Sequence, residues 1–98
     1  MKGYENVGEP GFQFELTGGH LAVDFANTLG NRRTDQPTDL LPNYRSIVNW
    51  ARQSSVLDAA TAGKFVREAA RRKDDAEVAR VRGIALRDAL FSIFAAVV

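Results

Sequence analysis

The chain has 98 residues, which is enough for one domain with a thin hydrophobic core. Its composition is ordinary for a globular protein, and its net charge of +1 gives no sign of polyanion binding. The absence of cysteine excludes disulfides and thiolate metal sites, and the single histidine, His20, cannot form a zinc site alone. The N-terminus lacks the apolar core of a signal peptide and no apolar run is long enough for a membrane span, so we expect a cytoplasmic protein without membrane contact.

The first apolar residues of the chain alternate with polar ones. Residues 1–11 are polar and glycine-rich, and we expect them to form a loose leader before a domain that spans residues 12–98. In the stretch FQFELT, residues 12–17, every second side chain is apolar, which is the period of a strand. Gly18 and Gly19 tolerate the positive φ angles of a tight turn, so an N-terminal β-hairpin is predicted.

Two interpretations of the next segment are open. Residues 20–23 pair back on the first strand, or a helix starts directly, because apolar residues recur every four positions from Leu21. We favour a hairpin that passes into a helix near Asp24, and this helix is predicted to end at Gly30. Residues 31–38 are polar and are predicted to form a loop.

The middle of the chain predicts an amphipathic helix from Leu40 or Asn43 to Ser54. Pro42 is acceptable in the first turn of a helix, where its missing N–H costs nothing. The inner face of this helix is expected to carry four side chains, with Trp50 on its flank as a core or rim aromatic: Tyr44, Ile47, Val48 and Ala51.

Two more helices are predicted in the second half of the chain. Asp58 can cap a helix that continues to about Arg72. Asp74 and Glu77 are spaced as in a capping box, so the last helix is expected to begin there and to continue to the end. The candidates for burial in the earlier of these helices are Phe65, Val66, Ala69 and Ala70.

The last ten residues, ALFSIFAAVV, are apolar on every side of a helix. Such a helix needs cover on all sides, yet the sequence has no polar stop signal, and each large exposed side chain costs about 1.5–3 kcal/mol. We expect either a domain truncated at its C-terminal end or a partner chain that packs here; a frayed terminus is the simpler alternative. The predicted surface for self-association consists of Leu90, Phe91, Phe94 and Val97.

A carboxylate and an amide interrupt the apolar residues of the stretch GGHLAVDFANTLGNR, residues 18–32. A buried carboxylate without a partner costs several kcal/mol, so Asp24 is expected to cap a helix or to pair with a nearby arginine. Asn27 lies three residues later on the same helix face. We predict a structural polar network of Asp24, Asn27, Thr28, Arg32 and Arg33. The alternative is a ligand-binding site for an unidentified effector, formed by Asp24, Asn27 and Arg32.

The sequence contains no catalytic constellation, so we expect a protein that is not an enzyme. His20 has no nucleophile to activate and is expected at the surface, and the glycine pair lacks the pattern of a phosphate-binding loop. The basic residues between positions 67 and 82 alternate with acidic ones, which is typical of a solvated face with salt bridges.

The chain resembles the ABATE domain family, bacterial proteins that usually carry a CGNR-type zinc finger after this domain. The family begins with a pattern of the form F-E-L-x-G-G-x-L-x-L-D-F-x-N-T, which this chain matches over residues 14–28. Weaker matches are Asp39-Leu40-Leu41, Trp50-Ala51 and Val56-Leu57, and the helical stretch from Leu86 to Phe91. The resemblance covers residues 12–95.

The resemblance implies a domain of bacterial stress-induced transcription regulators, in which the zinc finger holds the metal and contacts DNA. This chain has no cysteine, so we expect no cofactor in it, with zinc and DNA contact confined to a finger that is absent here. The expected fold is α+β and predominantly helical, with an N-terminal β-hairpin packed against three to four helices. The expected function is sensing or protein interaction, and the alternative is a helical dimerisation module without a small ligand.

Overall fold

The computed structural model of the chain describes residues 5–17, 19–30 and 36–97, the last without its side chain. The elements in chain order are α1 (Leu21–Ala26), β1 (Leu29–Gly30), β2 (Thr38–Asp39), α2 (Tyr44–Gln53), α3 (Ala59–Arg71) and α4 (Lys73–Val97). The fold is therefore predominantly helical α+β with a small hairpin, as predicted. Of the predicted loop 31–38, residues 31–35 lie outside the described part, and its last residue belongs to β2.

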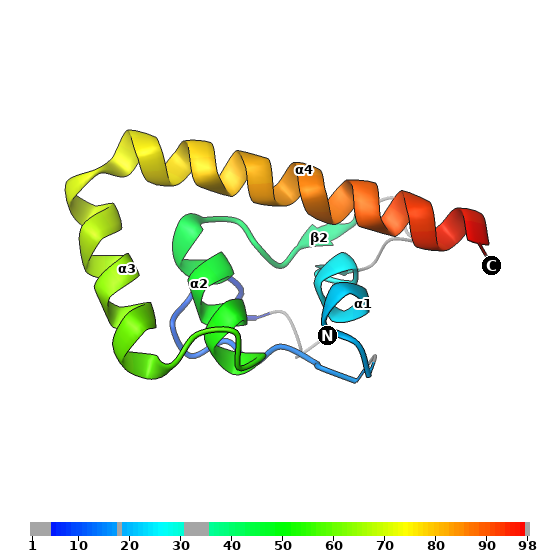
Figure 1. The fold of residues 1–98 in the computed structure, drawn as a ribbon, viewed down its shortest axis with the longest axis horizontal. Coiled ribbons are helices and arrows are strands. Elements are labelled where there is room, and N and C mark those ends of the chain that lie inside the picture. The colour runs from blue at the N-terminus through cyan, green and yellow to red at the C-terminus, as the bar shows by residue number, and fades with distance from the viewer. Residues whose placement is uncertain (1–4, 18, 31–35, 98) are drawn as a thin grey trace.

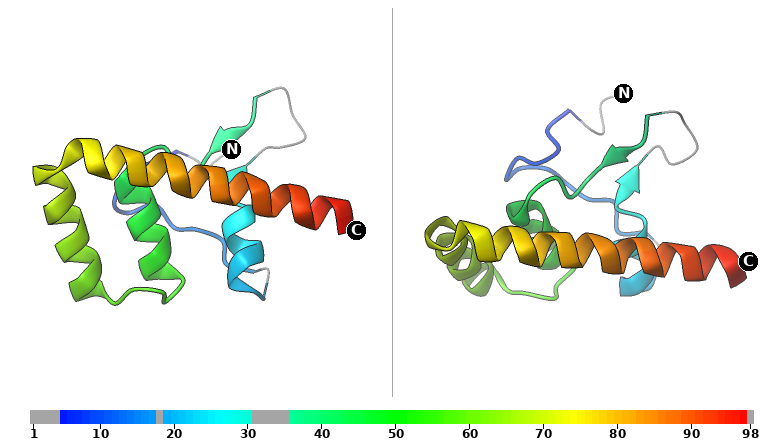
Figure 2. Two further views of the ribbon diagram at one scale, coloured as in Figure 1. Left: turned by 45° about the horizontal axis from the view of Figure 1, so that its top comes forward. Right: turned by 90° about the horizontal axis from the view of Figure 1, so that it is seen from above.

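The four helices form two layers. Helices α1, α2 and α3 stand side by side beneath α4, which crosses all three (Figure 1). Seen from above, the paired strands and the N-terminal segment lie to one side of the row of helices (Figure 2). The N-terminal segment thus passes behind α2, and α4 covers the ends of the other helices.

The β-hairpin does not lie where the sequence pattern placed it. Strands β1 and β2 pair with each other in antiparallel register, while residues 12–17 are extended but belong to no strand. Helix α1 begins directly at Leu21 and ends at Ala26. The favoured interpretation, a hairpin that passes into a helix near Asp24 and ends at Gly30, is therefore wrong, and the alternative of an immediate helix is correct. Gly19 has a φ of 77°, the positive angle that the glycine pair was expected to supply.

The predicted cap of α3 at Asp58 is confirmed, and α2 has a cap at Asn43, which was predicted only as a possible start of the helix, so Pro42 precedes the first turn. The Asn43 side chain accepts a hydrogen bond from the N–H of Ser46 at 2.8 Å, and the Asp58 side chain accepts one from the N–H of Thr61 at 2.7 Å. Between the two helices, Ser55 takes a φ of 68° and the chain reverses direction. Because the connection is short, α2 and α3 form an antiparallel helical pair (Figure 1).

The break between α3 and α4 falls at Arg72, whose φ and ψ of −132° and 61° are not helical. Helix α4 therefore starts at Lys73, one residue before the predicted capping residue Asp74, which lies within the first turn. Asp74 was predicted to cap α4 but lies in its first turn. An acidic residue there still stabilises the helix, because it faces the positive end of the helix dipole.

The core lies between α2, α4 and the segment after β2. Leu41 has no exposed surface, and Val48 and Trp50 of α2 are buried, which confirms Trp50 as a core aromatic. The centroid of the Trp50 ring lies 5.1 Å from that of Phe25 on α1. In α3 the buried residue is Ala62; the predicted burial of Phe65 and Ala70 is wrong, and Val66 and Ala69 are half-buried. A helix that packs on only two neighbours leaves a broad face in water.

Candidate functional site

A small polar cleft lies beside α1, between the extended segment and the residue that follows β2. We call it the α1 cleft. Its volume is about 210 Å³. It brings together two of the three predicted ligand-binding residues, Asp24 and Asn27. The other lining residues are Phe12, Gln13, Phe14, Glu15, Thr17, Thr28 and Leu40.

The end of α1 positions the polar residues of the α1 cleft. Asn27 is the residue at which the helix ends, and Thr28 is buried directly behind it. The Thr28 hydroxyl donates to the carbonyl oxygen of Phe25 at 2.7 Å, and its own carbonyl accepts from the N–H of Leu40 at 2.9 Å. Thr28 is thus a structural residue, and these bonds join it to backbone groups of Phe25 and Leu40 rather than to Asp24 or Asn27. The arginines of the predicted network, Arg32 and Arg33, lie outside the described residues.

One wall of the α1 cleft is held by side chains of α2 rather than by a neighbouring strand. The Gln53 amide donates to the carbonyl oxygen of Phe12 at 2.6 Å and accepts from the N–H of Phe14 at 2.8 Å. The Asn49 amide also donates to the carbonyl oxygens of Pro10 and Phe12, at 3.3 and 3.4 Å. The amide of Gln53 thus takes the place that a paired strand would occupy and fixes the extended segment.

A buried ion pair connects β2 to α4, and sequence reasoning did not predict it. Arg87 is 2% exposed and donates to both carboxylate oxygens of Asp39, at 2.7 and 3.3 Å, and to Asp88 at 2.9 Å. Burial by itself lowers the pKa of Arg87, but the hydrogen bonds to Asp39 and Asp88 outweigh it and raise the pKa above its ordinary value. One sequence signal could have indicated that Arg87 is buried: it is three and seven residues before Leu90 and Phe94 and therefore shares their apolar helix face.

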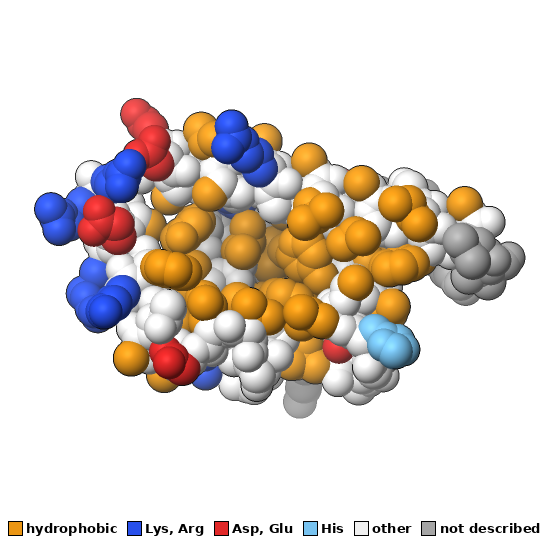
Figure 3. All heavy atoms as spheres, in the orientation of Figure 1, with side chains coloured by type: hydrophobic (Ala, Val, Ile, Leu, Met, Phe, Trp, Pro, Cys, Tyr) orange, Lys and Arg blue, Asp and Glu red, His pale blue; other side chains and the backbone are white. Residues whose placement is uncertain are grey.

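The apolar surface of α4 differs from the predicted association surface. Leu90, Phe91 and Phe94 are half-buried, and the side chain of Val97 lies outside the described part of the chain. The more exposed residues are Leu86, at 56%, and Ile93, at 57%. Figure 3 shows hydrophobic side chains along α4 and over α1 and α2, while most charges on this face gather where α3 meets α4.

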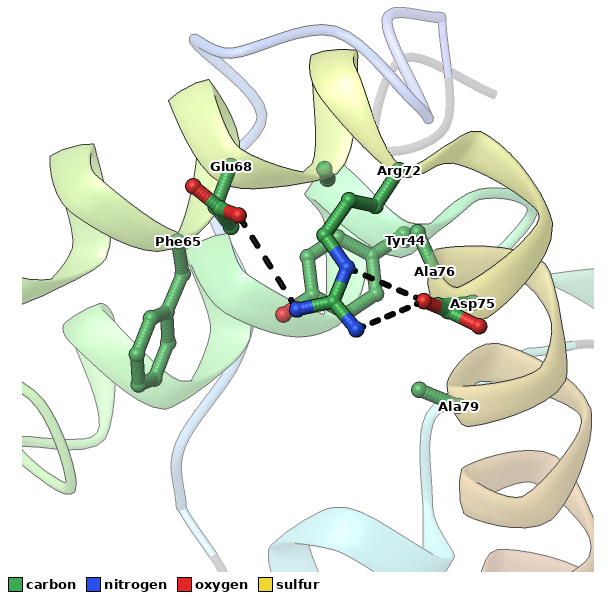
Figure 4. A pocket seen from close by; sticks show the side chains of 8 residues that line it. Tyr44, Phe65, Glu68, Arg72, Asp75, Ala76 and Ala79 are labelled. Atoms are coloured by element: carbon green, nitrogen blue, oxygen red, sulfur yellow. Dashed lines mark hydrogen bonds and ion pairs between the residues drawn. The ribbon is translucent and has the colours of Figure 1, made fainter.

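A second cavity, between α2, α3 and α4, contains charges that are already paired. Arg72 extends across it between two carboxylates (Figure 4). The guanidinium lies 2.8 Å from the nearer oxygen of Asp75 and 3.9 Å from that of Glu68. Arg71 shares Glu68 with Arg72, and Arg80 pairs with Glu77. The predicted face with salt bridges is therefore confirmed for these three arginines, whereas no ion pair among the described residues includes Arg67, another member of the predicted set.

A family model described as "Putative stress-induced transcription regulator", named ABATE, matches residues 19–98. The chain belongs to the ABATE family. No curated protein and no solved structure gives a significant match to the chain. The ABATE match includes α1 and every later element, whereas the extended wall of the α1 cleft, residues 12–17, precedes it.

The residues of this ABATE chain do not fit a zinc ion. Cysteine is absent, and the described residues contain no group of three histidine or acidic side chains that could hold a metal. His20 is exposed at the start of α1, as predicted, and makes no side-chain cap there. Among the described helices, none has the length and apolar character needed to cross a membrane. The ABATE description is that of a transcription regulator rather than of an enzyme.

Proposed function

We propose that this ABATE domain is the sensing part of a bacterial stress-induced transcription regulator, and that a small polar effector binds in the α1 cleft. Zinc binding and DNA contact belong, in this proposal, to a separate zinc finger. The observation that carries the proposal is the meeting of Asp24 and Asn27 in one cleft of about 210 Å³. Ligand sites in proteins are concave and contain a few convergent polar groups, and this cleft has that arrangement on a scale that suits a ligand of a few heavy atoms.

The surroundings of the α1 cleft support a role in signalling. Leu40 lines the cleft and is hydrogen-bonded to Thr28, and the adjacent Asp39 is paired with Arg87 of α4. A ligand that shifts Leu40 therefore acts on the ion pair that fastens α4. Coupling of this kind needs contiguous contacts between the two ends, and the chain provides them.

The sensing proposal is tested by NMR titration of the uniformly ¹⁵N-labelled protein with arginine, putrescine, glucose and glycerol. We expect at least one probe to shift the amides of Asp24, Asn27 and Leu40. Asp24→Asn should weaken that binding about tenfold, the equivalent of one charge-assisted hydrogen bond. Asp74→Asn, an exposed acid on α4, is the control. Absence of shifts at millimolar probe, or an equal effect of both variants, would refute the proposal.

Self-association through α4 is the second candidate function, and the exposure of Leu86 and Ile93 favours it. A dimer is stabilised by mass action, so its melting temperature rises with protein concentration. Leu86→Ser with Ile93→Ser should abolish this rise while the monomer remains folded, because neither side chain is buried. A sedimentation profile of a monomer at 100 micromolar wild-type protein, about the upper end of such assays, would exclude this function.

A further inference from the structure

Three arginines surround a groove between α2 and α3 that is separate from the α1 cleft. We call it the α2–α3 groove; its volume is about 500 Å³. Arg45 and Arg52 come from α2 and Arg67 comes from α3. Its lining, among the described residues, includes no acidic side chain. The surface between the arginines is formed by Val48, Ala62, Gly63 and Val66.

Helical spacing places these arginines along one groove. Arg45 and Arg52 are seven residues apart, which is two turns of α2 and brings both to one face. Gly63 and Arg67 are one turn apart on α3 and therefore share a face. The guanidinium of Arg52 donates to the Asn49 side chain at 2.8 Å, which holds it beside the groove and leaves its other N–H groups available.

The arginines of the α2–α3 groove form no ion pair with any described residue, although Arg45 also lines an adjoining cavity together with Glu9 and Glu77. Four other arginines, Arg71, Arg72, Arg80 and Arg87, lie against carboxylates. Within the described part of the chain, no carboxylate pairs with Arg45, Arg52 or Arg67. A concave surface with one sign of charge and low-dielectric walls concentrates ligands of the opposite charge.

We propose that the α2–α3 groove binds an organic carboxylate with an aromatic or branched aliphatic body. A guanidinium offers two parallel N–H donors, the geometry that a carboxylate accepts. The body of the ligand packs on Val48, Ala62 and Val66, and the groove has the volume of a site for such a molecule. Single-stranded nucleic acids also bind in cationic grooves, but they stack their bases on aromatic side chains, and the described residues that line this groove include none, so its aliphatic floor favours the amphipathic anion.

The test is an NMR titration of the ¹⁵N-labelled protein with 2-naphthoate, with the neutral 2-naphthamide as matched ligand. We expect naphthoate to shift the amides around Val48, Ala62 and Val66, and to bind at least about tenfold more tightly than the amide. Arg45→Gln and Arg67→Gln should each weaken binding of naphthoate. Arg82→Gln is the control variant, because Arg82 is exposed on α4 and does not line the groove.

Gly63→Leu tests the apolar floor without changing any charge. A Cβ at this position comes 3.2 Å from Nη1 of Arg67, the mobile end of a flexible side chain, so the variant can fold. Leucine also favours the helix over glycine. We expect Gly63→Leu to fill the groove and to lose naphthoate binding. Two-dimensional spectra and thermal melting will show that α3 is intact.

Three results would overturn the proposal. The first is equal binding of naphthoate and naphthamide, and the second is an effect of Arg82→Gln equal to that of Arg45→Gln. The third is tight binding of a 20-base-pair duplex, about two helical turns, that weakens with Arg45→Gln and with salt, since phosphate contacts give a steep salt slope. Loss of binding in Arg67→Gln and Gly63→Leu, with Arg82→Gln unchanged, would support it.

Discussion

Replacement of Arg87 by methionine tests the buried ion pair that connects β2 to α4. Methionine keeps an unbranched apolar stem of similar length, so the change removes the guanidinium and its hydrogen bonds with little loss of packing. Asp39 then keeps the hydrogen bond that its carboxylate accepts from the N–H of Leu41 at 2.8 Å but loses its cation. We expect a large loss of stability, because an ionised group near the core is left without its partner.

The magnitude follows from the burial of the two partners. Removal of one member of a buried ion pair costs about 3–5 kcal/mol. The side chain of Asp39 is 37% exposed and still reaches water, which places the loss for Arg87→Met at the lower end, about 3 kcal/mol. A domain of this length has a free energy of unfolding of about 5–15 kcal/mol, so the variant should unfold at a much lower urea concentration.

The assay is urea unfolding followed by circular dichroism and Trp50 fluorescence, on the wild type, Arg87→Met, Asp39→Asn and the double variant. We expect a coupling energy of about 2 kcal/mol between the two positions. Arg71→Met is the control, because the Arg71–Glu68 pair is exposed to water, with side chains 79% and 52% exposed, and exposed ion pairs contribute little. A loss below about 0.5 kcal/mol for Arg87→Met, or a coupling near zero, would refute the reasoning.

Three further predictions concern the cap of α2, the extended segment and the pH dependence. Asn43→Ala should lower the free energy of unfolding by about 1 kcal/mol in urea unfolding, because the helix loses its capping acceptor. Gln53→Ala should lower the free energy of unfolding by about 1–3 kcal/mol and accelerate hydrogen exchange at the Phe14 amide, whose acceptor it removes. Unchanged exchange would contradict the role of Gln53 in fixing residues 12–14. The pKa of Asp58 is lowered by the hydrogen bond from the N–H of Thr61, and that of Glu77 by the hydrogen bond from Arg80. Because both pKa values are depressed in the folded state, the stability they contribute is present at pH 7 and is lost as the pH falls through about 4 and below. Asp58→Asn should therefore lose less stability than the wild type between pH 7 and pH 3 in urea unfolding, and an equal loss would contradict this.

The helices could be predicted because their signals are local. A cap, a periodic face and a turn residue lie within a few positions of one another, and Asp58 caps its helix as predicted. The hairpin could not be placed in this way. The alternation over residues 12–17 predicted a strand, and these residues form none; Phe12 is buried as the pattern indicates, but a period of two does not say what pairs with the segment. Here the partner is the Gln53 side chain, 39 residues away from Phe14.

The candidate site was predictable in part for the same reason. Asp24 and Asn27 were singled out as polar residues in an apolar stretch, and both line the α1 cleft. The cleft wall and the Asp39–Arg87 pair depend on contacts between distant parts of the chain, 48 residues apart for this pair. Side-chain partners at such a separation follow from tertiary packing and leave no periodic pattern in a single sequence.

The arginines show why a net charge near zero says little about binding. The sum of +1 follows from 13 basic and 12 acidic residues and does not say where the charges lie. Four arginines of the second half pair with a carboxylate: Arg71, Arg72 and Arg80 within one helical turn, and Arg87 across the core. Those pairs contribute to local structure and cancel one another in the field around the protein. A ligand responds to the charges that remain without an ion pair. The fold brings three such arginines to one apolar groove: Arg45, Arg52 and Arg67. A binding site for an anion can therefore exist in a nearly neutral chain, provided that the fold pairs the other charges elsewhere.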